Sequence, residues 1–239
     1  MTNISSLLLE KTPKYEVTIP STGKKTRFRP FLVKEEKILL IAQSTQSKND
    51  IMFAIKDIIE SCVEGIEDAY DLPIFDIEYL FVKIRAKSVG ELVEPIIVCP
   101  QTGEKVDCAV NLDEVVLKRT EKHTNKIKIG DSIYVYMKYP SIRILESFGG
   151  DIDTTNSADF YSMVLNCIDS VETVDGKLSS VEIGREELGN FIDSMTKDQF
   201  DSLLSFFVTS PRLEKVVKYM TNDGVKRELT LSGLGDFFG

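Results

Sequence analysis

The sequence predicts an α+β protein built from two similar modules, in each of which antiparallel β-hairpins flank a small helical bundle. Three observations lead to this prediction. Pairs of alternating segments surround short turns, helix-like apolar stripes lie between these pairs, and a basic segment poor in apolar residues separates the two halves. The expected boundaries are 1–117 for the first module, 118–128 for a basic linker and 129–239 for the second module.

The first module is expected to open with a β-hairpin followed by a helix. Residues 15–19 alternate as a strand does, residues 21–24 supply a turn, and residues 26–31 return as the second strand. Glu35 lies where the positive end of a helix dipole favours a carboxylate, which predicts a helix over residues 33–46.

Two further helices are indicated by apolar residues at three-and-four spacing. The first has a cap at Asn49 or Asp50 and a stop at Gly65, and the second ends at Gly90. Their stripes consist of Ile51, Ala54, Ile55, Ile58, Ile59, Cys62 and Val63, and of Ile77, Leu80, Phe81 and Ile84. Residues 91–99 and 105–110 then predict a second hairpin.

The second module repeats this order of hairpin, helices and hairpin. Its expected segments are strands at 126–129 and 133–139, a short helix at 141–148, three helices containing Phe160 to Ile168, Leu188 to Met195 and Phe200 to Phe207, and a hairpin of 214–221 with 225–231. The last of these helices begins with a capping box, Thr196 to Gln199. Because Gly103 aligns with Gly224 in the two closing hairpins, we regard a duplicated module as a hypothesis.

Composition restricts the classes of protein to which this chain can belong. Hydrophobic residues make up 42% and charged residues 28%, a balance typical of a folded protein, and no apolar run approaches the roughly 20 residues of a membrane span. The net charge of −9 disfavours general binding to nucleic acid, which is itself an anion. Without a recognisable secretory signal, and with four widely spaced cysteines, the protein is expected to be made in a reducing cytosol.

No catalytic residue is predicted. The chain has one histidine, His123, and its charged surroundings indicate a solvated imidazole. The sequence contains no nucleophile elbow, phosphate-binding loop or dinucleotide-binding glycine motif. We therefore expect a soluble subunit that docks onto other proteins and is not an enzyme.

Two segments resemble metal sites, but a structural role without a metal ion is favoured for each. Asp151, Asp153 and Thr155 resemble the start of a calcium loop, although the loop lacks its final glutamate, so a helix-capping loop is expected and a hydrolase using these aspartates is a remote alternative. Cys99 and Cys108 face each other across a predicted hairpin as in half of a zinc ribbon. We predict no metal and no cofactor, and keep a zinc-ribbon adaptor that binds nucleic acid or a polymerase as the alternative function.

Two phenylalanines near the end of the sequence need a docking place. Leaving Phe237 and Phe238 in water would cost roughly 1.5 to 3 kcal/mol each. They are expected to pack either in the protein's own core or on a partner, and the sequence does not decide between the two.

Several stretches resemble the baseplate hub proteins of T-even-like contractile-tailed bacteriophages, a family of hub subunits and hub-assembly factors. The stretches are residues 27–37, 75–81 and 85–91, extended by Cys99-Pro100, Tyr139-Pro140 and residues 234–238. The resemblance implies a late viral protein without an active site, whose partners are other hub or tail proteins. It implies a location in the virion tail baseplate, in the host cytoplasm during assembly, or both. Self-association into a homo-oligomer is a further alternative.

Two stretches of mixed charge beside apolar residues are the best interface candidates. They are the lead-in to the first helix and the corner after the third, and they contribute Arg29, Phe31, Lys34, Glu35, Lys37, Ser88 and Glu91 as expected partner-binding residues, together with Phe237 and Phe238. The alternative for the first stretch is an ordinary helix start whose charges are solvated.

Overall fold

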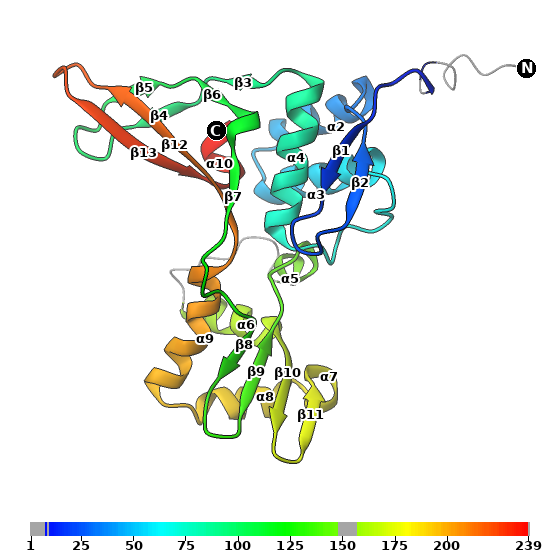
Figure 1. Cartoon of the computed structure of the whole chain (residues 1–239), viewed down its shortest axis with the longest axis vertical. Helices are drawn as coiled ribbons and strands as arrows, with labels where there is room; N and C mark the ends of the chain where they lie inside the picture. Colours follow the sequence, from blue (N-terminus) through cyan, green and yellow to red (C-terminus); the bar gives the residue numbers. More distant parts are fainter. Residues whose placement is uncertain (1–7, 9, 148–156, 239) are drawn as a thin grey trace, which may run out of the picture. The chain divides into compact units, whose positions relative to one another are not determined.

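The computed structural model describes residues 8, 10–147 and 157–238 (Figure 1). Within these residues, all strand pairs are antiparallel and the strands form several small sheets that are accompanied by helices. The predicted α+β class is therefore confirmed. No helix in this part of the chain combines the length and apolarity needed to cross a membrane.

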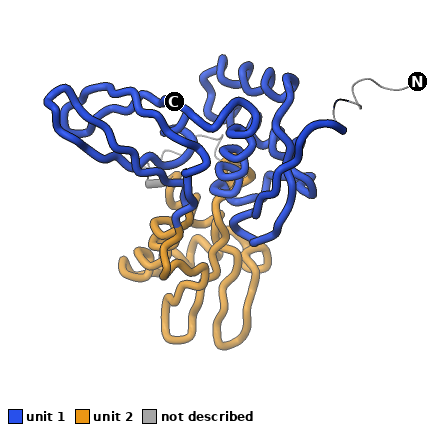
Figure 2. Tube along the Cα trace, turned by 45° about the horizontal axis from the view of Figure 1, so that its top comes forward, with its two compact units in different colours: residues 1–118, 212–239 blue, residues 119–211 orange. Residues whose placement is uncertain are grey.

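The chain forms two compact units whose limits differ from the expected modules (Figure 2). Unit 1 contains the described parts of 1–118 and 212–239, whereas unit 2 contains those of 119–211. The chain leaves unit 1 after β7 (Val116–Lys118) and returns at β12 (Arg212–Met220), and these two strands are neighbours in one sheet. Because Lys118 lies opposite Arg212, unit 2 is an insertion between two paired strands.

Unit 1 starts with a hairpin and three helices. Their bounds are β1 (Tyr15–Thr18), β2 (Lys25–Phe28), α2 (Val33–Ser44), α3 (Lys48–Cys62) and α4 (Ile74–Ser88). The first hairpin and the α3 stripe are confirmed, because Ile58 and Ile59 are fully buried. The α3 cap differs from the expected one, since the Ser47 side chain accepts a hydrogen bond from the Asp50 amide.

Two hairpins that are distant in the sequence share one core in unit 1. The elements are β3 (Leu92–Val93), β4 (Ile96–Val98), β5 (Lys105–Asp107), β6 (Val110–Asn111), the 3-10 turn η1 (Leu112–Glu114), β7, β12, β13 (Lys226–Ser232) and α10 (Gly233–Phe238). Cys99 and Cys108, at the ends of the β4–β5 hairpin, belong to the same buried cluster as Tyr219 and Leu231 of the β12–β13 hairpin. The two hairpins compared in the duplication hypothesis thus lie in the same unit.

Unit 2 is a four-stranded sheet, in the order β11-β10-β9-β8, packed with helices. Its elements are β8 (Lys126–Lys128), β9 (Tyr134–Met137), α5 (Ile142–Glu146), α6 (Ser157–Cys167), β10 (Ile168–Thr173), β11 (Gly176–Ser179), α7 (Ser180–Ile183), α8 (Arg185–Asp193) and α9 (Lys197–Thr209). The capping box is confirmed, because the Gln199 side chain accepts from the Thr196 amide at 2.8 Å and the Thr196 hydroxyl accepts from the Gln199 amide. The β10–β11 hairpin is absent from the sequence prediction.

Candidate functional site

The two stretches predicted to form an interface meet in the structure. The Phe31 amide donates a hydrogen bond to the Ser88 hydroxyl at 2.9 Å, although these residues are far apart in the sequence. The same hydroxyl donates to the Ile84 carbonyl of α4 at 2.6 Å. The lead-in to α2 is therefore attached to the last turn of α4.

Arg29 and Glu35 pair with each other inside unit 1. The Arg29 Nη2 atom lies 2.8 Å from Glu35 Oε1 and also donates to the Ser61 carbonyl at 3.0 Å. Glu35 Oε2 accepts from the Leu32 amide at 2.8 Å, and the residue is only 2% exposed. Burial raises the pKa of Glu35, but the hydrogen bonds from Arg29 and Leu32 outweigh it and hold the pKa below its ordinary value. These two predicted partner-binding residues thus anchor the start of α2.

The outward side of α2 exposes an unusual amount of apolar surface. We call Val33, Lys34, Lys37, Ile38, Leu40 and Ile41 the α2 surface. Its apolar members have exposed fractions of 70% for Val33, 41% for Ile38, 58% for Leu40 and 65% for Ile41. Within α2 only Glu35 and Ala42 are buried. Lys34 and Lys37 are among the residues predicted from the sequence, whereas Leu40 and Ile41 are not. A helix that is apolar on most sides is itself a signal of burial against another surface.

The corner after α4 combines an ion-pair network with exposed apolar side chains. Lys87 Nζ lies 2.5 Å from Glu91 Oε1 and 3.2 Å from Asp113 Oδ2. Val89 and Leu92, on either side of Gly90, are exposed. Glu91 is therefore paired within its own unit, while its apolar neighbours face solvent.

Phe237 and Phe238 dock within their own unit, which is one of the two expected alternatives. Phe237 is 1% exposed and belongs to the core that the two hairpins share. The Phe238 ring lies edge-on to Phe81 with 5.7 Å between centroids. The Leu234 amide of α10 donates to Glu78 Oε1 at 3.3 Å, and burial raises the pKa of Glu78 to about 6.

Cys99 and Cys108 are both buried, but they do not face each other as expected. Cys99 follows β4 and its amide donates to the Glu104 carbonyl at 2.8 Å, whereas Cys108 follows β5 and its amide donates to the Pro95 carbonyl at 3.2 Å, at the other end of the hairpin. Burial raises the pKa of Cys99, but the neighbouring Thr102 and Tyr219 hydroxyls and the nearby backbone amides of the turn outweigh burial and lower the pKa to about 7. No group of three or more histidine, cysteine, aspartate or glutamate residues that could hold a metal occurs in the described part of the chain. The calcium-like residues Asp151, Asp153 and Thr155 lie outside the described residues.

His123 is not the solvated imidazole that its sequence context predicts. Its Nδ1 lies 2.8 Å from the Thr209 hydroxyl and its Nε2 lies 2.8 Å from the Tyr139 hydroxyl. Its ring also stacks on Tyr139 at 5.6 Å and packs against Phe206 at 5.2 Å between centroids. Burial, together with repulsion from Arg119, lowers the pKa of His123. The prediction was wrong because the aromatic partners come from segments distant in sequence.

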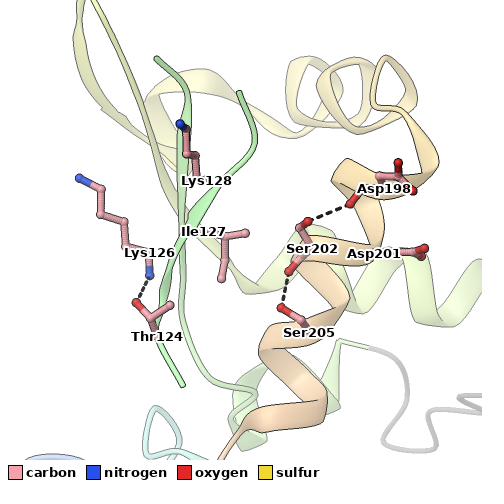
Figure 3. A pocket seen from close by; sticks show the side chains of 8 residues that line it. All are labelled: Thr124, Lys126, Ile127, Lys128, Asp198, Asp201, Ser202 and Ser205. Atoms are coloured by element: carbon pink, nitrogen blue, oxygen red, sulfur yellow. Dashed lines mark hydrogen bonds between the residues drawn. The ribbon is translucent and has the colours of Figure 1, made fainter. Parts of the chain in front are cut away.

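A shallow pocket of about 480 Å³ lies between β8 and α9 in unit 2 (Figure 3). Its walls mix the lysines of β8 with the hydroxyl and carboxylate groups of α9. The Ser202 and Ser205 hydroxyls donate to the helix carbonyls of Asp198 and Ser202, at 2.8 and 2.6 Å. These serines are therefore engaged with their own helix, and neither is paired with a general base in the manner of a nucleophile.

A second pocket, of about 500 Å³, lies between the first hairpin and α4 in unit 1. Tyr79, Lys83 and Lys87 line it from α4, and Tyr15 and Phe28 line it from the strands. It therefore combines aromatic walls with several ammonium groups.

Comparison with protein families gives a match. A family model described as T4 bacteriophage base plate protein matches residues 12–239. Neither the curated proteins nor the solved structures contain a match to the chain.

Proposed function

Because the chain belongs to the T4 bacteriophage base plate protein family, we propose that it works at the baseplate hub, as a hub subunit or a hub-assembly factor. It does so by binding other baseplate or tail proteins and catalyses no reaction. Family membership alone makes the chain a protein of the phage baseplate.

The observation that carries the proposal is the α2 surface. Leu40 and Ile41 are 58% and 65% exposed, on a helix that carries further exposed apolar residues. Exposed apolar side chains that gather on one element mark protein–protein contacts, because association removes them from water. Lys34 and Lys37 add charge among these apolar residues, and such charges orient a partner.

The attachment of α2 supports a preformed docking surface. The Arg29–Glu35 pair fixes the start of the helix, and the Phe31–Ser88 hydrogen bond ties its lead-in to α4. A surface that is already ordered before binding loses less conformational entropy when a partner arrives. The α2 surface is therefore suited to recognition by a rigid neighbour.

The test is a double substitution on α2, Leu40→Glu with Ile41→Glu. The control is Val181→Glu in unit 2, because Val181 is 89% exposed and also lies on a helix. Each variant is mixed with purified baseplate proteins of the same phage and analysed by size exclusion. We expect the α2 variant to lose co-elution and the control to retain it; co-elution of both would refute the α2 surface as the docking site.

The hub-subunit and assembly-factor alternatives differ in where the protein ends up. A subunit remains in the mature virion, whereas an assembly factor is present in infected cells and missing from finished particles. Quantitative mass spectrometry of purified virions and of infected-cell lysate separates the two, and a copy number per virion below one would identify an assembly factor.

A further inference from the structure

The pocket between the first hairpin and α4 has preformed walls. The hairpin turn is held to α4 by the Ser21 amide, which donates to Asp76 Oδ1 at 3.0 Å, and the far end of the hairpin is held by a bridge between Phe28 and Val63. Tyr79, Lys83 and Lys87 follow one another at intervals of four along α4, so they share the face of the helix that lines the pocket. The cavity of about 500 Å³ is large enough for an inserted side chain.

The two pocket lysines of α4 differ in how their charges are compensated. Lys87 is neutralised by Glu91 and Asp113, at 2.5 and 3.2 Å. Lys83 forms no ion pair with any carboxylate among the described residues, and its ammonium lies 5.5 Å from the Tyr79 ring centroid. Burial lowers the pKa of Lys83, the attraction of Asp113 opposes this, and the repulsion of Lys87 adds to it. Lys83 is thus a half-buried cation without a carboxylate partner.

The charged residues that line the pocket include one more cation than anions. Lys25 is exposed on β2 and forms no ion pair within the described part of the chain. Glu16 lies opposite Arg27 in the hairpin register, and Asp113 is engaged by Lys87. The residues that line the pocket thus include three lysines and two carboxylates, and Glu91, outside the lining, also pairs with Lys87.

We propose that this pocket receives an aspartate or glutamate side chain of a neighbouring baseplate protein, whose carboxylate pairs with Lys83. Tyr15, Tyr79 and Phe28 accept the apolar stem of that side chain. The charge complementarity and the aromatic walls identify the occupant as an acidic side chain. The inference rests on the proposed protein-binding function and names a contact that the α2 surface does not supply.

The test compares Lys83→Met with Lys177→Met. The control lysine also lies against a tyrosine, with its Nζ 3.7 Å from the Tyr136 ring centroid, but it belongs to unit 2. Affinities for the baseplate proteins that bind the wild-type chain are measured by calorimetry, and melting temperatures by circular dichroism. We expect Lys83→Met to bind about tenfold more weakly, as for the loss of a partly desolvated charge pair, and the control to bind within twofold of wild type.

The melting temperature distinguishes a recognition role from a structural one. Removing an uncompensated, half-buried cation should leave the melting temperature of Lys83→Met equal to or above that of wild type. A lower melting temperature would mean that Lys83 supports the fold and would overturn the proposal, as would wild-type affinity in Lys83→Met.

A second arm separates a partner's side chain from a free small carboxylate. Glutarate, the probe, is titrated into the wild-type chain, and its binding is monitored by NMR. Glutarate binding combined with unchanged protein affinity in Lys83→Met would assign the pocket to a small molecule and overturn the proposal. If the wild-type chain bound no baseplate protein at all, the proposed function itself would fail; if wild type and Lys83→Met bound equally, only the pocket inference would fail.

Discussion

The α2 surface and the helix α10 both carry apolar residues, but these residues differ in their exposure to solvent. Phe237 of α10 is 1% exposed in a core built from two hairpins, whereas Ile41 of α2 is 65% exposed. The apolar composition of the two segments is similar, so composition alone does not show which of them is buried. What separates them is whether another element of the chain presents a complementary face, and for α10 the hairpins and α4 do so. Phe237 of α10 therefore stabilises unit 1, whereas the exposed apolar residues of α2 form the surface proposed above for recognition.

The largest expected effect is the loss of the α10 anchor. Phe237→Ala removes a fully buried ring and should lower the free energy of unfolding by about 3 kcal/mol or more, because the cavity cannot refill. Urea denaturation of the whole chain measures it. Ile41→Ala is the matched substitution on α2 and should change stability by less than about 0.5 kcal/mol. Equal losses in the two variants would abolish the distinction between the segments.

The next effect concerns the anchor of α2. Arg29→Met leaves the buried Glu35 carboxylate without its main cation and should cost about 2 kcal/mol at pH 7. The folded pKa of Glu35 lies below its ordinary value of 4.5, so the stability it contributes is present above pH 4.5 and is lost as the pH falls. The difference in the free energy of unfolding between the variant and wild type should therefore shrink as the pH is lowered from 7 to 3, as measured by denaturant unfolding. A gap that is constant with pH would contradict this account.

A smaller effect, of opposite sign, is expected at the attachment of α10. Burial raises the folded pKa of Glu78 from 4.5 to about 6, so its ionisation destabilises the fold as the pH rises through this range. Glu78→Gln keeps an acceptor for the Leu234 amide and should stabilise the protein by about 1 to 2 kcal/mol at pH 8, with no gain at pH 4. Thermal melts at the two pH values test it, and a gain at pH 4 equal to that at pH 8 would exclude the ionisation mechanism.

The smallest expected effect on stability is on the α2 surface itself. Leu40→Gln replaces an exposed leucine by another good helix former and should change the free energy of unfolding by less than about 0.5 kcal/mol. Its affinity for baseplate proteins should nevertheless fall. A stability loss of several kcal/mol would show that Leu40 is packed in the isolated chain, contrary to its exposed fraction.

Local patterns predicted local structure well. The α3 stripe and the Thr196–Gln199 capping box both depend on residues within a few turns of one helix, and both are present. The β10 strand was missed because Cys167 and Ile168 continue the apolar stripe of the preceding helix α6, so periodicity gives no sign of the change.

Long-range pairings were the part that the sequence could not supply. The pairing of β7 with β12 makes unit 2 an insertion, and it joins strands separated by the whole of that unit. Partner binding by the predicted residues stays a prediction, and the structure adds what the sequence did not give: Phe31 contacts Ser88, and Arg29 pairs with Glu35. A charged residue in the first turn of a helix is usually solvated. Glu35 is instead buried, and its pairing with Arg29 is evident only in the folded chain.

The insertion of unit 2 between β7 and β12 has a mechanical consequence. Leu117 and Leu213 lie side by side in the antiparallel pair just before the chain enters unit 2 and just after it leaves. A pull on unit 2 is shared by two adjacent tethers and draws both in the same direction, so it does not slide one strand past the other. Such tension passes from β12 to the ladder that it forms with β13, which runs from the Glu214–Ser232 pair to the Met220–Lys226 pair.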